Sequence, residues 1–153
     1  MTDMTGNKII LLVANGFAQA DFITLQREMM NQGAGFTVVS CEKNLVNGFN
    51  GNEWGLTFPV NQQIDSVLGS DFDTIVVIGG EQSVARLSEN DHTARIMDSF
   101  IEAEKPMVLL NEAQTLTATS SSNVMVVNGE VTEDNVSDII AHIAGAGEMA
   151  KAA

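Results

Sequence analysis

The residues best placed to do chemistry are polar residues and glycines that follow continuous apolar runs. In chain order they are Asn15, Gly16, Asp21, Gly79, Gly80, Asn111 and Glu112. Apolar runs of this kind typify the strands of a parallel sheet, and ligands on such sheets bind outside the carboxyl ends of the strands. We therefore expect these residues to surround one crevice, with Asn15, Gly16, Gly79 and Gly80 as its ligand-binding part.

Asp21 and Glu112 allow two interpretations. Placed close together, two carboxyl groups raise the pKa of one of them into the range of a general acid, and the Gly80 N–H would then anchor an anion. The other interpretation is that each carboxylate caps the start of its own helix, where N–H groups lack partners. Gly79–Gly80 is equally consistent with a plain turn.

Asn111 stands at the sharp step from a strand to a helix, where an activated nucleophile would be serine, cysteine or threonine. An amide cannot form a covalent intermediate, and Asn111 also suits a tight turn without any chemistry. Cys41 is the only cysteine; it ends a different strand, and nothing places it beside Asp21. His92 and His142 are at neither expected site position.

The segment after the first apolar run lacks the glycine pattern of a dinucleotide site and the hydroxyl-rich phosphate loop of a flavodoxin. No aspartate closes the first or third strand, as a phosphoacceptor receiver would require. The residues therefore predict no nucleotide or flavin cofactor and no metal site.

Alternating strands and helices must position these residues. We predict buried strands at 8–13, 36–40, 74–78, 106–110 and 124–127, and helices at 20–32, 64–68, 81–87, 91–104, 112–118 and about 136–143. Residues 47–59 contain two Asn-Gly pairs and predict an antiparallel hairpin at a sheet edge, in which Phe49 and Trp54 would be covered by a helix or a partner subunit. This order predicts an open α/β sheet with helices on both faces.

Length and composition set the class of protein. A chain of 153 residues with 44% hydrophobic residues predicts one folded domain, 1–153, with its core at about 8–144 and a small-residue tail. A formal charge of −13 disfavours nucleic acid and membrane surfaces as partners. With one cysteine, no signal peptide and no run long enough to span a membrane, we expect a cytoplasmic protein.

Three segments together resemble the ThiJ/PfpI superfamily, which is related to class I glutamine amidotransferases. They are the opening ILLVANGF with Asp21, the strand end VVIGG, and KPMVLLNEA around Asn111. The likeness runs from about Lys8 to Ile143 and is nearest to the C-terminal domain of large-subunit catalases, which also lacks the cysteine and reads Gly-Gly-x-x-Ser-Val, as Gly79–Val84 does. It implies a flavodoxin-like three-layer sandwich, a mostly parallel sheet with an antiparallel edge hairpin.

By position, the resemblance places the family's nucleophile on Asn111 and its acidic partner on Asp21. It implies a catalytically silent protein with a vestigial site at Asp21, Asn111 and Glu112, which binds a small molecule or a protein partner and forms a homodimer through the first helix near Met29 and Met30. The alternatives are a cysteine-independent hydratase or isomerase acting on a small carbonyl compound through Asp21 and Glu112, and a holdase-like stress protein.

Overall fold

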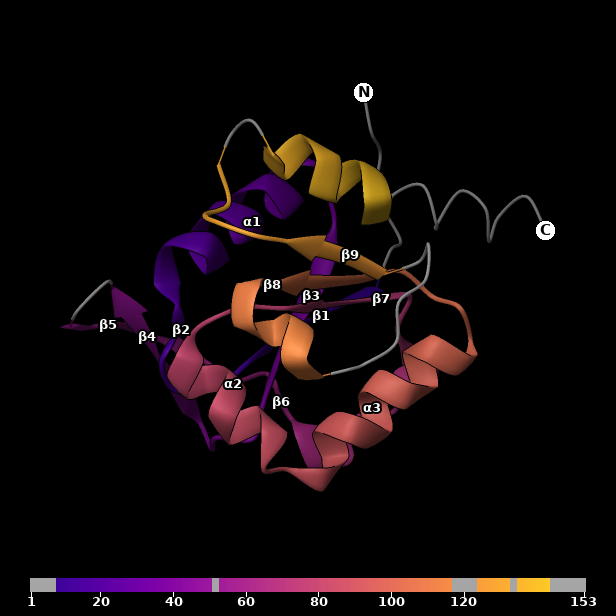
Figure 1. Cartoon of the computed structure of the whole chain (residues 1–153), viewed down its shortest axis with the longest axis horizontal. Helices are drawn as coiled ribbons and strands as arrows, with labels where there is room; N and C mark the ends of the chain where they lie inside the picture. The colour runs from indigo at the N-terminus through magenta and orange to yellow at the C-terminus, as the bar shows by residue number, and fades with distance from the viewer. Residues whose placement is uncertain (1–7, 51–52, 117–123, 133–134, 144–153) are drawn as a thin grey trace.

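A six-stranded, all-parallel sheet forms the centre of the computed structural model, which describes residues 8–50, 53–116, 124–132 and 135–143. The strand order is β6-β3-β1-β7-β8-β9 (Figure 1). Its strands are β1 Lys8–Val13, β3 Gly35–Ser40, β6 Gln62–Gln63, β7 Thr74–Val77, β8 Met107–Leu110 and β9 Val124–Val127. The predicted strands are therefore confirmed, and the additional two-residue β6 extends one edge.

Residues 9–13 of the central strand β1 are all apolar, because both faces of the strand are covered. Ile9, Leu11 and Val13 belong to the core on one face of the sheet. Ile10 and Leu12 alternate with them and belong to the core on the other face. All five side chains are 0% exposed, as expected for a strand covered on both sides.

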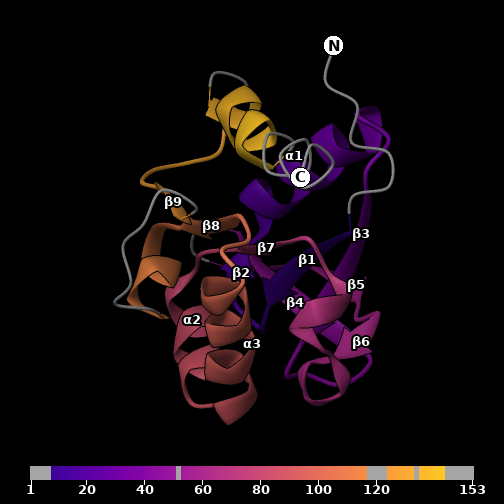
Figure 2. The same ribbon diagram turned by 90° about the vertical axis from the view of Figure 1, so that its right-hand side faces the viewer.

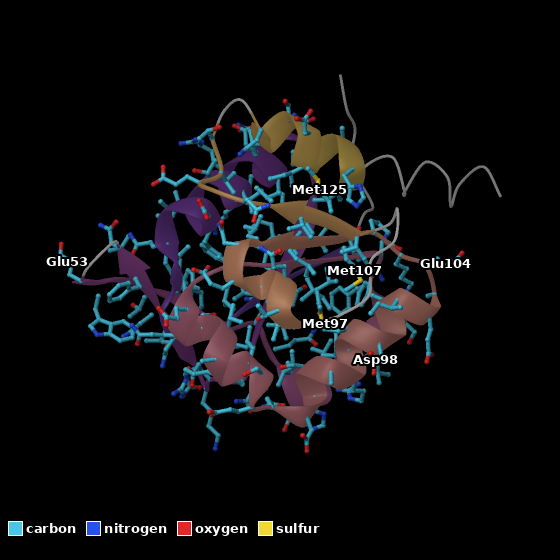
Figure 3. The ribbon with its side chains drawn as sticks, in the orientation of Figure 1. Glu53, Met97, Asp98, Glu104, Met107 and Met125 are labelled. Atoms are coloured by element: carbon cyan, nitrogen blue, oxygen red, sulfur yellow. The ribbon has the colours of Figure 1, made fainter. Side chains whose placement is uncertain are left out.

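Helices cover both faces and complete three layers. On one face lie α1 Gln19–Asn31 and a C-terminal helix formed by residues 135–143, side by side in both views (Figures 1 and 2). On the other lie α2 Glu81–Ser88 and α3 Asp91–Glu102. Figure 3 shows Met97 and Met107 in the layer between α3 and the sheet. The flavodoxin-like class is therefore confirmed.

A second, smaller sheet holds the predicted hairpin. Its strand order is β2-β4-β5, with β2 Phe17–Ala18, β4 Leu45–Asn50 and β5 Glu53–Pro59. The hairpin is antiparallel as predicted, but it pairs with β2 and does not extend the edge of the main sheet.

The predicted cover over the hairpin aromatics is only partial within this chain. The Phe49 side chain is half-buried and meets the Trp54 ring edge-on, with 5.4 Å between centroids. Trp54 remains 53% exposed, so the prediction that a helix of this chain covers it is wrong. That a partner subunit covers Trp54 stays a prediction.

Two predicted helices are short 3₁₀ turns. The segment expected at 64–68 is η1 Ile64–Ser66, followed by η2 Gly69–Asp71, and the segment expected at 112–118 is η3 Asn111–Leu116. Residues 117 and 118, like the C-terminal tail, lie outside the described residues. Among the helices that the structure describes, none is long and apolar enough to cross a lipid bilayer.

Candidate functional site

The crevice at the carboxyl ends of the strands is built on close backbone contact between β2 and the turn after β7. The Ala18 N–H donates to the Gly79 carbonyl at 2.8 Å. Gly80 has a φ of +123°, and a Cβ there would lie 2.5 Å from the Gly16 oxygen and 3.0 Å from the Phe17 Cα. Both the left-handed backbone and the close approach require glycine, so this turn is more than a plain connection.

Asn111 forms the elbow after β8, with a φ of +52° that few residues other than glycine adopt. Its side chain binds both backbone polar groups of one residue in the segment after β9: Oδ1 accepts from the Gly129 N–H at 2.7 Å, and Nδ2 donates to the Gly129 carbonyl at 3.0 Å. The amide side chain therefore has a structural role at the position where the family resemblance puts a nucleophile.

Asp21 lies in the first turn of α1 but does not cap it. The N-cap is Ala18, whose side chain makes no capping hydrogen bond. The Asp21 carboxylate is instead 4% exposed, and its Oδ1 accepts the Val131 N–H at 2.9 Å. The capping interpretation of Asp21 is therefore wrong, because a backbone donor more distant in sequence takes the carboxylate.

Burial raises the pKa of Asp21, the Val131 N–H opposes this shift, and the nearby charges of Glu130 and Glu112 add to it. The charge of Glu112 therefore reaches Asp21. Each carboxylate nevertheless binds a different backbone group.

Glu112 binds the Gly80 N–H, with Oε1 accepting at 3.0 Å. The interpretation of Glu112 as a cap of its own helix is wrong, since the donor belongs to the start of α2. The same bond corrects the predicted anion anchor: the Gly80 N–H is already paired with a carboxylate of the protein.

A pocket of about 300 Å³ opens beside this bond. It is lined by Gly16, Ala18, Phe49, Gly80, Glu81, Gln82 and Glu112. Of the predicted ligand-binding residues, Gly16 and Gly80 line it, whereas Asn15 and Gly79 do not. Asp21 and Asn111 also lie outside the lining.

Asn15 connects the end of β1 to neighbouring elements. Its N–H donates to Glu42 Oε2 at 3.0 Å, and its Oδ1 accepts the Asn47 N–H at 2.8 Å. Glu42 also accepts two hydrogen bonds from Arg86, from Nε to Oε2 at 2.5 Å and from Nη2 to Oε1 at 2.6 Å. Burial opposes ionisation of Glu42, but the Arg86 and Asn15 hydrogen bonds hold its pKa below the usual value.

Cys41 lies beside this ion pair in a separate hollow with Glu42, Arg86, Glu89 and Asn90. Burial and then the Glu42 charge raise the pKa of the thiol, which disfavours the reactive thiolate. Of the histidines, the His92 N–H donates to the N-cap residue Asn90 at 2.9 Å, and His142 belongs to the C-terminal helix. Neither lines the pocket.

Sequence reasoning missed the segment 129–131, which binds both Asn111 and Asp21. The dipeptide Asn128–Gly129 marks a turn after β9, but its partners lie on distant elements. Sequence reasoning also missed Glu42, which accepts a hydrogen bond from the Asn15 N–H. Within the part of the chain that the structure describes, no group of three His, Cys, Asp or Glu residues could hold a metal ion.

Comparisons with known proteins agree with this architecture. The model of the DJ-1/PfpI family matches residues 7–132. No curated protein sequence matches the chain. Among solved structures, a ThiJ/PfpI domain protein from Brachyspira murdochii has a TM-score of 0.76 at 14% identity, with 95% of this chain and 98% of that chain covered.

Two proteins named DJ-1 have the same fold. Drosophila melanogaster DJ-1beta has a TM-score of 0.76 at 16% identity, with 95% of this chain and 96% of that chain covered. Oxidized Toxoplasma gondii DJ-1 has a TM-score of 0.70 at 15% identity, with coverage of 94% and 89%. At these identities the likeness is one of fold.

Proposed function

The chain belongs to the DJ-1/PfpI family, and we propose that it is a member without covalent catalysis, acting as a binding module through the pocket beside Gly80. We also propose that it works in the reducing cytoplasm, which suits a chain whose single cysteine, Cys41, cannot form an internal disulfide.

One observation carries the proposal: Asp21 and Asn111 both hold the backbone of a single short segment. Asp21 accepts from the Val131 N–H, and Asn111 exchanges two hydrogen bonds with Gly129. Covalent catalysis needs a nucleophile beside a base, with free N–H donors for the developing oxyanion. Asn111 is no nucleophile, and the Gly80 N–H already donates to Glu112.

The cysteine-independent hydratase or isomerase is the second candidate, and the raised pKa of Asp21 favours it, since such a carboxyl can serve as a general acid. The burial of Asp21, which is only 4% exposed, argues against a hydratase or isomerase function. A general acid must come within hydrogen-bond reach of its substrate, and Asp21 is absent from the pocket lining. Binding without turnover therefore agrees better with the geometry.

Oxygen exchange separates the two functions. We expect ¹⁸O exchange between water and acetaldehyde to proceed at the same rate with the full chain as in buffer. A protein without an accessible general acid should not accelerate the hydration of acetaldehyde. Asp21→Asn should give the same rate. Exchange that wild type accelerates and Asp21→Asn abolishes would overturn the proposal and establish a hydratase.

We further propose that a second copy of the chain covers the hairpin. Leu45, Trp54 and Leu56 are each more than half exposed on β4 and β5, and Met30 of α1 is 64% exposed. Trp54 and Leu56 are two residues apart on β5 and so lie on the same face of the strand, and exposed apolar side chains that lie together are typical of an interface. Met29, which was expected beside Met30 at an interface on the first helix, is fully buried in the core.

Sedimentation velocity tests this interface. Wild type should sediment as a dimer and Trp54→Ser with Leu56→Ser as a monomer, while the control Leu68→Ser, at an exposed leucine outside the hairpin, stays dimeric. A monomeric wild type would refute the dimer. A monomer that suppresses aggregation of an unfolding client would instead favour the holdase-like function.

A further inference from the structure

The pocket beside Gly80 lies where β2, the start of α2 and the hairpin meet (Figure 1). Its volume of about 300 Å³ is at the lower end of the range for small-molecule sites, roughly 300–1,000 Å³. Backbone at Gly16 and Gly80 forms part of the wall, and close contacts leave no space for a Cβ at either residue. The size and the backbone wall suit a small ligand of a few heavy atoms.

The charged groups of the lining are all acidic. Glu81 and Glu112 line the pocket, and no lysine, arginine or histidine is among its described lining residues. Glu112 Oε1 accepts the Gly80 N–H, whereas no partner is found for Oε2 or for the Glu81 carboxylate among the described residues. Two exposed acidic residues therefore line the pocket, and no basic side chain lies among the described lining residues.

The start of α2 does not reverse this charge. A helix N-terminus carries about +0.5 of an elementary charge, which attracts anions. Here the Gly80 N–H is already taken by Glu112, and Glu81 lies in the first turn. Two full negative charges outweigh half a positive one, so the pocket repels carboxylates and phosphates.

An aromatic wall completes the lining. Phe49 is one of the lining residues, and its ring stands at 82° to the Trp54 ring, with 5.4 Å between the centroids. The face of an aromatic ring carries negative electrostatic potential and attracts organic cations. Carboxylates beside an aromatic ring favour an ammonium ion with a short apolar chain over a neutral molecule of the same size.

We propose that this pocket binds a small organic ammonium ion, with its charged head between Glu81 and Glu112 and against the Phe49 ring. This inference rests on the proposed binding function and names its ligand class. The inference requires neither turnover of the ligand nor chemical modification of Cys41.

The test uses the ¹⁵N-labelled full chain and n-butylammonium chloride as the probe, with 1-butanol, sodium butyrate and magnesium chloride compared at constant ionic strength. Butylammonium should produce saturable chemical-shift changes at the amides of Gly16, Gly80 and Gln82. Butanol should bind at least about tenfold more weakly, because it lacks the charge, and butyrate and Mg²⁺ should produce no saturable change at these amides.

Matched variants identify the groups responsible. Glu81→Gln and Glu112→Gln should each weaken butylammonium binding about fivefold, as loss of a partly exposed ion pair predicts. Glutamine at 112 retains an oxygen for the Gly80 N–H, so the turn is preserved. Phe49→Leu should weaken binding two- to fivefold, the magnitude of an exposed cation–π contact. Glu102→Gln, at an exposed residue near the end of α3, should change nothing.

Butyrate, butanol or Mg²⁺ binding as well as butylammonium would overturn the inference, as would unchanged affinity in both pocket glutamine variants. Acetaldehyde hydration by wild type would overturn the proposed function and leave these binding results as they stand. The two failures are therefore distinguishable.

Discussion

Asn111 and Gly129 exchange two hydrogen bonds, at 2.7 and 3.0 Å, across 18 residues of sequence. The pair joins the elbow after β8 to the segment after β9. Because Asn111 has a φ of +52°, the pairing also holds a residue in a backbone conformation that costs free energy.

Replacing Asn111 should separate the hydrogen bonds from the backbone conformation. Asn111→Gly loses both side-chain hydrogen bonds, and each loss should lower the free energy of unfolding by about 1 kcal/mol. Asn111→Ala loses them too and also strains a left-handed backbone, so it should be about 1 kcal/mol less stable than the glycine variant. Urea unfolding measures both values. Equal stability of the alanine variant and wild type would show that the pair contributes nothing.

Asp21 should make stability depend on pH in a particular direction. Burial raises its folded-state pKa above the usual 3.8, so the folded chain holds this proton more tightly than the unfolded chain. The contribution of Asp21 to stability therefore falls as the pH rises from about 3.8 through the folded-state pKa, and stays low above it.

Asp21→Asn removes this titration and keeps an oxygen for the Val131 N–H. The stability of the variant relative to wild type should therefore be greatest at neutral pH and should decline on acidification toward the usual carboxyl pKa. Urea unfolding over this pH range measures the difference, with Asp98→Asn controlling for loss of an exposed carboxylate. A difference independent of pH would contradict the prediction.

The turn before α2 should tolerate no side chain at Gly80. Gly80→Ala strains a left-handed backbone and also places a Cβ 2.5 Å from the Gly16 oxygen. Gly129→Ala is a matched control, since its φ is +96° but no atom lies within 4 Å of the added Cβ. Gly129→Ala should lower the free energy of unfolding by about 1–2 kcal/mol, and Gly80→Ala should lower it by clearly more. Thermal and urea unfolding measure both changes. Similar losses would mean that the close contact relaxes freely.

Asn111→Cys should not produce an acidic thiol. The carboxylates of Glu112 and Asp21 lie near the elbow, and negative charge disfavours a thiolate. In a Cys41→Ser background, the alkylation rate against pH should give a thiol pKa at or above about 8.5, with ordinary peroxide sensitivity. A pKa below about 7 would show that the site keeps the electrostatics of a catalytic cysteine.

Strand and helix positions were largely predictable because local patterns determine them. The apolar residues of β1 and the spacing of Phe22, Leu25 and Met29 on α1 predict the observed elements. The hairpin was predictable from its Asn-Gly pairs, but its place was not. Pairing of β4 with the two-residue β2 depends on the whole chain, and nothing in the local sequence signals it.

By itself, the sequence determined the alternating α/β architecture and the presence of an amide, rather than a nucleophile, directly after β8. Only the tertiary structure decided what Asp21, Asn111 and Glu112 do. The partner of Asp21 lies 110 residues away and that of Glu112 lies 32 residues away. Side-chain oxygens bind whichever N–H groups the strand and helix ends leave unpaired, and folding alone brings those groups together.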